Sequence, residues 1–357
     1  MKTDLMLVPS DTLVLAEGLE LSSGAELDVP VPPGAELFEA VRQLYLSKHC
    51  SQGKKAYEAG CEGCAKHGNC DGEAVAGAHN AEPTSIGMTI GAPLLARELA
   101  GRIEPLHPAP DDLVVDERHR DFIFAQPSYL EALRGDFVRH DATGLRLLVP
   151  ASRKAGAEPL GAYLTRKGVR VWAERKAERM AEGEHYVSAK RLFEIEQRIE
   201  RDSAGAATMS LHLRLRAGVG IVVPVELPEG RAGFELPALI VLGRGMRTAH
   251  VEEVQLPQPD IKLKAGRRWR LASLGPMTGQ PGGLPAWIDP KEWTTRPPYP
   301  PGGKLFAVAR RTGARVPPAP GGPQASRDVL AAGSTWFIEF NDPVRVEQST
   351  WILAGGY

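Results

Sequence analysis

Short apolar runs alternate with charged and Pro/Gly-rich segments along the chain, a pattern that predicts many strands and few helices. Near the N-terminus, residues 5–8 and 12–15 are predicted strands on either side of the turn Pro9-Ser10-Asp11. Four apolar residues from Leu37 to Tyr45 recur at i, i+4, i+7 and i+8, which is the spacing of one helix face. This stretch is therefore predicted to be an amphipathic helix.

The middle of the chain is rich in mixed charge. Residues 170–183 and 188–201 carry Glu, Lys and Arg throughout, which predicts two solvated helices with i,i+4 ion pairs and no contact function. Close to the C-terminus, an Ala-Ala-Gly-Ser turn leads into a strand of aromatic and β-branched residues at 335–340. Further strands are predicted at 84–95, 209–214, 220–225, 236–242 and 305–309.

This order of strands and sparse helices predicts an α+β fold, and two ferredoxin-like β-α-β-β-α-β modules fit it. The first module is expected over residues 1–165, with a Cys-rich insertion at 49–72. The second is expected over residues 166–357, with a Gly-rich loop and a Pro-rich insertion at 275–323. The expectation is therefore two modules, each interrupted by an insertion.

The 357-residue chain carries 43 basic and 44 acidic side chains, a net charge of −1. Such a chain does not bind nucleic acid over its whole surface, so a polyanionic partner must be held by local patches. The apolar run after Lys2 is interrupted by Asp4 and Asp11, which argues against a secretory signal. The longest apolar stretch, residues 219–225, is too short to span a bilayer, so a soluble, cytoplasmic protein with no membrane partner is expected.

All four cysteines lie in one 21-residue window. Two cysteines separated by two residues present both sulfurs to one ion, and two more complete a tetrahedron. The polar, Gly-rich sequence around them has no hydrophobic pattern to order it, so a structural zinc is predicted, with reduced or redox-active thiols as the alternative. Four thiolates leave no open position for catalysis. The predicted ligands are Cys50, Cys61, Cys64 and Cys70, with His49 or His67 able to replace one cysteine.

A Gly-rich loop follows the predicted strand at 236–242. Gly243 and Gly245 let backbone N–H groups approach a phosphate closely, while Arg244 and Arg247 supply positive charge. The alternative is an ordinary glycine turn with solvated arginines. The loop lacks the G-x-G-x-x-G and Walker spacings, so it does not predict mononucleotide binding.

The densest basic stretch is residues 262–270, with five cations in nine residues around an Ala-Gly turn. It is predicted to form a hairpin that straddles an RNA backbone, with an aromatic ring available to stack on a base. The alternative is a solvated hairpin whose tryptophan packs inward. The candidate RNA-binding residues here are Lys262, Lys264, Arg267, Arg268, Trp269 and Arg270.

Five groups of short segments carry a resemblance to a known family. They are Pro9-Ser10-Asp11-Thr12-Leu13 with Pro32-Pro33-Gly34, Gly91-Ala92-Pro93-Leu94 with the loop from Pro108 to Val114, Gly161 to Thr165 with Gly168, Glu196-Gln197-Arg198-Ile199, and the Ala-Gly-Ser turn near the C-terminus. Together they resemble the RAMP superfamily, in particular the Cas-five-like subunit of type III-B (Cmr) CRISPR effector complexes. The resemblance spans nearly the whole chain and adds Arg42 and Arg198 to the candidate RNA-binding residues.

The resemblance implies a non-catalytic subunit with RRM-like RAMP modules, which holds the 5′ handle of the CRISPR RNA (crRNA) in an antiviral ribonucleoprotein. It also implies docking on the large polymerase-like subunit and on the backbone RAMP subunits. The Pro-rich insertion suits docking, because prolines pre-order an extended loop, and Trp287 and Trp293 are typical anchor residues. A loop folded back over its own core is the alternative for these tryptophans.

Two other functions remain open. The first is the equivalent subunit of a type III-A or III-D complex. The second is a zinc-stabilised soluble enzyme that uses the adjacent acids Asp111 and Asp112. The sequence contains no H-E-x-x-H or G-x-S-x-G motif, and adjacent acids in a Pro-bounded loop more often form a turn or cap than a general base.

Overall fold

The fold comes from a computed structural model that describes residues 1–10, 34–50, 70–76, 87–116, 121–127, 148–150, 157–174, 180–201, 207–242, 247–256, 262–263, 268–275, 277–280, 284–285, 293–294, 303–309, 329–330, 332–340, 344–345 and 352–356. This part of the chain is α+β, with mostly antiparallel strands and few helices, as the pattern predicts. No helix within it is long and apolar enough to cross a bilayer. The helices are α1 (Gly34–His49), α3 (Asp71–Ala76), α4 (Arg166–Ala173) and α5 (Ala189–Leu192).

The chain forms two compact units that interleave along the sequence. Unit 1 consists of residues 1–24, 32–105 and 190–257, and unit 2 of residues 25–31, 106–189 and 258–357. Each unit therefore takes residues from both sides of position 165. The module boundary expected at that position stays a prediction.

Unit 1 is built on an antiparallel sheet in which strands run in the order β3-β13-β1-β15-β14. Strand β1 pairs with β13 on one side and β15 on the other, so Leu7 lies between Ile221 and Val251. The short strand β2 also pairs with β13. The strands are β1 (Lys2–Pro9), β2 (Thr89–Ile90), β3 (Leu94–Leu99), β13 (Val219–Glu226), β14 (Ala238–Leu242) and β15 (Arg247–Val254).

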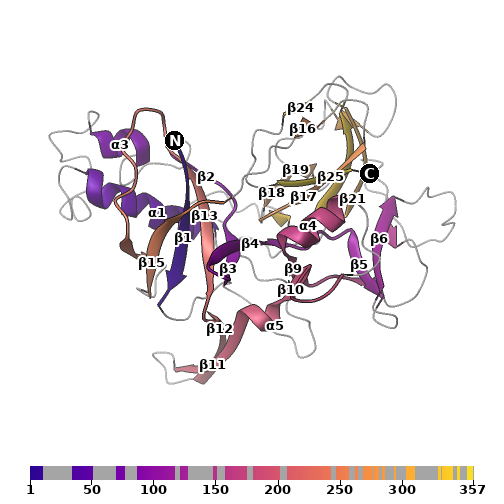
Figure 1. The fold of residues 1–357 in the computed structure, drawn as a ribbon, viewed down its shortest axis with the longest axis horizontal. Coiled ribbons are helices and arrows are strands. Elements are labelled where there is room, and N and C mark those ends of the chain that lie inside the picture. The colour runs from indigo at the N-terminus through magenta and orange to yellow at the C-terminus, as the bar shows by residue number, and fades with distance from the viewer. Residues whose placement is uncertain are drawn as a thin grey trace. The chain divides into compact units, whose positions relative to one another are not determined.

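The helix face predicted from the apolar spacing is buried. Leu37, Val41, Leu44 and Tyr45 are each at most 6% exposed. Helix α1 contacts strand β14 and lies beside α3 (Figure 1). Removing this apolar stripe from water stabilises the unit, which is why the i, i+4 pattern is a sound indicator of the helix.

Strand β1 is buried on both faces. Leu5 and Leu7 are fully buried, and because neighbouring side chains of a strand point to opposite faces, Met6 lies on the other side. There Met6 packs in a cluster with Ala96 and Val222. A strand covered on both sides has a continuous apolar sequence, and this makes β1 recognisable from its residues alone.

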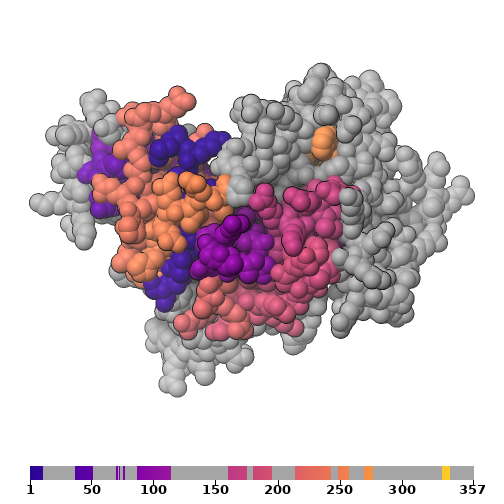
Figure 2. Space-filling view, in the orientation of Figure 1, coloured from indigo at the N-terminus to yellow at the C-terminus, as the bar shows by residue number. Residues whose placement is uncertain are grey.

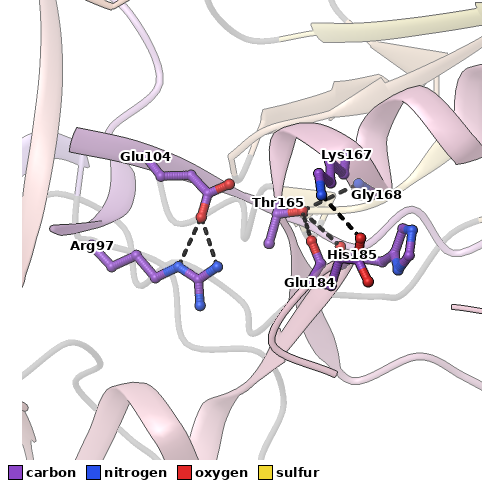
Figure 3. Close-up of polar contacts among 7 residues, drawn as sticks. All are labelled: Arg97, Glu104, Thr165, Lys167, Gly168, Glu184 and His185. Carbon is purple, nitrogen blue, oxygen red and sulfur yellow. Dashed lines mark hydrogen bonds and ion pairs between the residues drawn. The ribbon is translucent and has the colours of Figure 1, made fainter. Parts of the chain in front are cut away.

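The β3–β4 hairpin closes through a two-residue turn. Strand β4 (Arg102–Pro108) begins in unit 1 and ends in unit 2. Ala100 and Gly101 both have positive φ, 52° and 71°, as a type I′ turn requires. An ion pair between Arg97 and Glu104 crosses the hairpin. The Nε and Nη2 atoms of Arg97 lie within 2.8 Å of the Oε2 atom of Glu104 (Figure 3).

Residues 188–201 do not form the predicted second helix. The segment contains the short α5 and then strand β11 (Phe193–Arg201), which pairs with β12 (Ala207–Leu215) along its whole length. Phe193, Ile195 and Ile199 are spaced by multiples of two, which is the strand period, and pairing with β12 decides in favour of that period. High charge alone is therefore a poor indicator of a solvated helix here.

Unit 2 holds several smaller sheets. The largest has the order β20-β21-β23-β17-β25, and β20–β21 is the one parallel pair of strands in the described ranges. The others are β7-β6-β5-β8, β19-β18-β22 and β16-β24, and β9 pairs with β10 and with the end of β4.

The strands of unit 2 that precede residue 190 are β5 (Leu113–Asp116), β6 (Asp121–Pro127), β7 (Leu148–Pro150), β8 (Ala157–Pro159), β9 (Ala162–Leu164) and β10 (Tyr186–Ser188). Those that follow residue 257 are β16 (Lys262–Leu263), β17 (Arg268–Ser273), β18 (Met277–Gln280), β19 (Leu284–Pro285), β20 (Trp293–Thr294), β21 (Gly303–Ala309), β22 (Val329–Leu330), β23 (Thr335–Phe340), β24 (Val344–Arg345) and β25 (Ile352–Gly356). This unit is therefore made almost wholly of short strands.

Most strand predictions in the described ranges are confirmed, namely those that became β1, β12, β13, β14, β21 and β23. The prediction of one strand over residues 84–95 is wrong, because Gly91, Ala92 and Pro93 separate β2 from β3. Pro93 has no N–H to donate to a neighbouring strand, which disfavours a continuous ladder. The predicted strand at 12–15 lies outside the described residues.

Helix α4 is anchored at its N-terminus. The Oγ1 atom of Thr165, its N-cap, accepts a hydrogen bond from the N–H of Gly168 at 3.2 Å and donates one to the carbonyl of Glu184 at 2.7 Å (Figure 3). Gly168 lies so close to His185 that an added Cβ would be 1.9 Å from its carbonyl oxygen. The helix predicted at 170–183 thus begins earlier, at Arg166, and ends at Ala173.

We expect Gly168→Ala to lower the free energy of unfolding by about 1–3 kcal/mol, because the added methyl group must displace α4 from His185. Gly161→Ala is the matched control, since a Cβ there meets nothing within 4 Å. It should change the free energy of unfolding by less than about 0.5 kcal/mol. Urea unfolding followed by tryptophan fluorescence measures both, and equal stability of the two variants would contradict this packing.

Candidate nucleic-acid interface

Many residues predicted to bind RNA or metal lie outside the described ranges, so their roles stay predictions. The others lie in the described ranges, so their positions relative to neighbouring residues of the same unit can be stated. Those outside the described ranges are Gly243, Arg244, Gly245, Lys264, Arg267, Cys61, Cys64 and His67.

The Gly-rich loop connects two paired strands of unit 1. The register pairs Leu242, the last residue of β14, with Arg247, the first residue of β15. Residues 243–246 therefore join the ends of a hairpin, and Arg247 stands at its base. Arg198 lies elsewhere, on β11 opposite Ser210.

The described ends of the basic stretch, residues 262–263 and 268–270, pair with other strands and not with each other as the predicted hairpin requires. Lys262 begins β16, which pairs with β24, whereas Arg268 begins β17, which pairs with β23 and β25. Both strands find their partners in the C-terminal segment, whose extended backbone satisfies their ladder hydrogen bonds. Trp269 is partly buried and lies on β17 opposite Ile338 and Gly356.

Arg270 is buried in unit 2, and its guanidinium is bonded to protein groups. Its Nη1 donates to Oδ2 of Asp112 at 2.7 Å, and its Nη2 donates to the main-chain carbonyl of Trp172. The guanidinium carbon also lies 4.7 Å from the ring centre of Trp172, a cation–π contact. The indole Nε1 of Trp172 donates to the other oxygen of Asp112 at 2.8 Å. These three side chains, which we call the Arg270 cluster, join β17, α4 and the loop before β5.

Two arginines predicted to bind RNA are thus held inside the protein. Arg270 is 1% exposed, and a phosphate could reach it only by breaking the pair with Asp112. Arg42 is 4% exposed, and its Nε and Nη2 donate to the two carboxylate oxygens of Glu39 at 2.9 Å. Its Nη1 donates to the carbonyl of Ala76 at 3.3 Å, which links α1 to α3. Both arginines have structural roles in this conformation.

The loop that precedes β5 and the Ala-Gly-Ser turn meet in unit 2. The N–H of Asp111 donates to the carbonyl of Gly333 at 2.8 Å, and the N–H of Gly333 donates to Ser273 at the same distance. Gly333 has a φ of +90°, and an added Cβ would lie 2.5 Å from the carbonyl oxygen of Ala109. Only glycine fits at this position. The hydrogen bonds also show that two segments that carry the family resemblance are in contact.

The adjacent acids that the enzyme alternative would use lie in the buried loop before β5. Both oxygens of Asp112 accept hydrogen bonds within the Arg270 cluster. Asp111 is 8% exposed and its backbone holds the Gly333 turn. In the part of the chain that the structure describes, no group of three or more His, Cys, Asp and Glu residues is placed to hold a metal ion.

The two described ends of the Cys-rich insertion lie close together. Cys50 follows α1 and Cys70 precedes α3, and the Sγ of Cys70 lies 4.0 Å from the carbonyl oxygen of His49. Gly72 packs against the backbone of His49 and Cys50, where an added Cβ would meet atoms at 3.1–3.3 Å. The Nε2 of His49 lies 3.0 Å from the carbonyl of Gly233, which leaves its Nδ1 for another ligand. The first and last predicted zinc ligands therefore stand at the neck of the insertion.

Helix α4 carries three exposed cations to which the sequence analysis gave no contact role: Arg166, Lys167 and Arg170. Lys167 donates to Oε1 of Glu184 at 2.9 Å, and this hydrogen bond and charge lower the pKa of Glu184 (Figure 3). The side chains of Arg166 and Arg170 form no hydrogen bond or ion pair within the described part of the chain. Basic residues directly after the Thr165 N-cap were the sequence signal for this group.

A protein-family model matches most of the chain. The family model described as CRISPR-associated protein (Cas_Cmr3) matches residues 39–353. No curated protein sequence matches the chain significantly.

Chains in solved structures of CRISPR complexes also match, at low sequence identity and low TM-score. A chain of type III-B Cmr-beta bound to cognate target RNA has 11% identity and a TM-score of 0.37, covering 94% of this chain and 86% of that chain. A chain of the Csm3–Csm4 subcomplex of a type III-A interference complex has 10% identity and a TM-score of 0.37, covering 99% of each chain. A chain of a Csm1–Csm4 cassette in complex with pppApA has 12% identity and a TM-score of 0.35, covering 97% of this chain and 98% of that chain.

The buried ion pair of the Arg270 cluster should contribute to the stability of the protein. Arg270→Met leaves the Asp112 carboxylate buried without its cation, so we expect the free energy of unfolding to fall by about 3–5 kcal/mol. Lys167→Met is the control, because water and salt screen the exposed pair with Glu184 and its loss changes stability far less.

Adding Asp112→Leu to Arg270→Met should recover part of the lost stability, because the unpaired charge is removed. Urea unfolding of the single and double variants measures this recovery. A single variant as stable as the wild type would mean that the buried pair does not hold unit 2 together.

Proposed function

Because the chain belongs to the CRISPR-associated Cas_Cmr3 family, we propose that it holds the 5′ handle of the crRNA in a type III-B (Cmr) effector complex. The chain is a RAMP-superfamily, Cas-five-like subunit of a type III CRISPR–Cas complex. The observation that carries the proposal is the match of the family model over residues 39–353, which includes most of each compact unit.

The proposed RNA contacts are local, as the charge of the chain requires. A protein with a net charge of −1 can hold a polyanion only where cations are concentrated. The Gly-rich loop, with Gly243, Arg244 and Gly245, joins β14 to Arg247 at the start of β15, and we assign it to phosphate contacts. The other proposed contacts are Arg198, Lys262, Lys264, Arg267, Arg268 and Trp269.

Arg42 and Arg270 take supporting roles in this proposal. Their guanidinium groups are engaged by Glu39 and Asp112, so they position α1 and β17 instead of contacting RNA. Trp269, the neighbour of Arg270 on β17, keeps its proposed role as a base-stacking residue. Burial of one residue and partial exposure of the next follow from the alternation of a strand.

The subunit is proposed to be non-catalytic. The acids that an enzyme would need, Asp111 and Asp112, lie in a buried turn in which Asp112 already accepts two hydrogen bonds. A general base must be within reach of a substrate proton, and the Asp112 carboxylate is instead bonded to Trp172 and Arg270. The burial of this turn and the hydrogen bonds of Asp112 support the non-catalytic role.

The proposed partners, besides the crRNA, are the large polymerase-like subunit and the backbone RAMP subunits of the complex. The Pro-rich insertion at 275–323 is the proposed docking segment, with Trp287 and Trp293 as anchors. Trp293 begins the short strand β20, and Trp287 lies outside the described residues. The equivalent role in a type III-A or III-D complex is the second candidate. Chains of solved Csm subcomplexes are among the structures that match.

Two structural details complete the proposal. Each half of the chain is proposed to contain a ferredoxin-like RAMP module, in which RNA lies against a sheet. The Cys-rich insertion is proposed to bind one structural zinc ion through Cys50, Cys61, Cys64 and Cys70, with His49 or His67 as a replacement ligand. The Cys70 sulfur lies against the carbonyl of His49, the residue before Cys50, and this supports a single shared site.

Charge reversal tests the RNA contacts. We expect Arg247→Glu, Arg267→Glu and Arg268→Glu together to weaken binding to repeat-derived RNA and to reduce its dependence on salt, because fewer counterions are released. Arg270 is left unchanged, since a glutamate beside Asp112 would unfold unit 2. Fluorescence anisotropy at several salt concentrations measures the affinity and the slope.

The control for charge reversal away from the proposed contacts is Lys48→Glu with Arg216→Glu, because both cations are exposed and already paired with carboxylates of Glu235 and Glu194. It should bind repeat-derived RNA more tightly than the triple variant. Handle binding that survives the triple variant unchanged would mean that the interface lies elsewhere.

Metal content tests the zinc site. Protein purified without chelator should contain about one zinc ion per chain, and Cys61→Ser with Cys64→Ser should abolish it, because two thiolate ligands are lost. Hydrogen exchange should then change within the insertion while β1 and β13 stay protected, since the pairing of these two strands uses no residue of the insertion. Protein that holds no zinc and has four freely titrating thiols would contradict the site.

A further inference from the structure

We propose that the exposed side of helix α4 is a further RNA-backbone contact, in which Arg166 and Arg170 bind phosphates. The inference rests on the proposed function and extends it to a surface outside the loop at 243–246 and the stretch at 262–270. It assigns a role to a helix whose charge pattern by itself indicates only solvation.

The positive charges of α4 lie where they destabilise the helix. A helix N-terminus carries a partial positive charge from its unpaired N–H groups, and acidic residues are favoured there. The first turn of α4 contains no acidic residue, and Arg166 and Lys167 follow the N-cap directly. Arg166 and Arg170 are also like charges at i and i+4, a pair that destabilises a helix. An arrangement that disfavours the helix on its own becomes favourable once an anion binds to it.

The two arginines are available for such an anion. Both are exposed, and their side chains have no ion-pair or hydrogen-bond partner within the described ranges. Lys167 differs, because Glu184 neutralises it at 2.9 Å. The segment that carries α4 reaches the molecular surface (Figure 2). Residues at i and i+4 have Cβ atoms about 5–6 Å apart, so neighbouring phosphates of one strand can each meet one arginine.

The helix is also held rigidly, which lowers the entropy lost on binding. Thr165 caps its first turn, and Gly168 is pressed against the carbonyl of His185. At its other end, Trp172 bonds Asp112 and stacks on Arg270 of β17. The cations of α4 are thereby fixed to the strand that begins with the proposed RNA contact Arg268. An RNA strand held at β17 therefore has a second basic surface in the same unit.

The chemistry favours RNA over an acidic protein surface. Arginine presents a planar fork of donors that matches a phosphate, and the contact needs no particular base. The phosphates of an RNA strand form a continuous line of charge, which suits two arginines one turn apart whose side chains have no partner among the described residues. An acidic patch on a partner subunit is the competing occupant.

The test uses the full chain with Arg166→Ala and Arg170→Ala together. Binding to repeat-derived RNA and to oligouridylate of equal length is measured by anisotropy at several salt concentrations. We expect affinity for both RNAs to fall roughly tenfold at about 0.1 M salt, because two phosphate contacts are lost. The slope of log affinity against log salt should fall by about 1.4, or about 0.7 per contact. The melting temperature should stay unchanged or rise, since like-charge repulsion is removed.

Two comparison variants make the result specific. Lys48→Ala with Arg216→Ala removes the same net charge from cations paired with Glu235 and Glu194, and should keep a wild-type slope. Arg166→Lys with Arg170→Lys keeps the charge and should also keep the slope. If this lysine variant loses the slope as the alanine variant does, charge is not the cause and the inference is overturned.

The outcomes separate the inference from the proposed function. If the wild type binds repeat-derived RNA and the alanine variant binds it with the same affinity and salt slope, the role of α4 is overturned and the proposed function stands. Loss of complex assembly without loss of RNA binding overturns it in favour of an acidic protein partner. Absence of wild-type binding to repeat-derived RNA contradicts the proposed function itself, and the inference with it.

Discussion

The buried ion pair between Arg270 and Asp112 is the interaction on which unit 2 depends. Transferring two charges out of water carries a large desolvation cost, which close geometry and further hydrogen bonds must offset. Here the contact is 2.7 Å, the indole of Trp172 donates to the second carboxylate oxygen, and its ring stacks on the guanidinium. One pair therefore determines how a loop, a helix and a strand pack together.

The same region explains why the motifs of this family lie far apart in the sequence. The loop before β5 and the turn at Gly333 are more than 200 residues apart, and they meet through the hydrogen bond from Asp111 to Gly333. The positive φ of Gly333 and its closeness to Ala109 permit no side chain. These motifs shape unit 2, and in the proposed function they position other residues that contact RNA.

A nearly neutral chain can bind a polyanion only if its cations differ in what they contact. Arg42 and Arg270 are neutralised by buried or bidentate partners, and Lys167 by an exposed one. Arg166 and Arg170 are the exposed cations of α4 whose side chains are left without such partners in the described ranges. Net charge is therefore a poor indicator of polyanion binding, whereas the partner of each cation indicates whether that cation is available to bind an anion.

The sequence by itself determined the elements whose pattern is local. Helix α1 follows from apolar residues at i, i+4, i+7 and i+8, and β1 and β13 follow from continuous apolar runs, because burial of one face or of both faces leaves that spacing. The resemblance to the family also required only short segments in order. Residues 188–201 were misjudged because their charge fits a helix, while pairing with β12 makes most of them a strand.

Only the tertiary structure decided which candidate residues are free to bind. Arg270 and Arg268 belong to the same basic stretch, and nothing in that stretch shows that Asp112, 158 residues away, buries one of its arginines. The pairing of β16 with β24, and of β17 with β23 and β25, likewise depends on distant segments. Spacing along a chain reports local periodicity, whereas the burial of a charge depends on what the fold brings beside it.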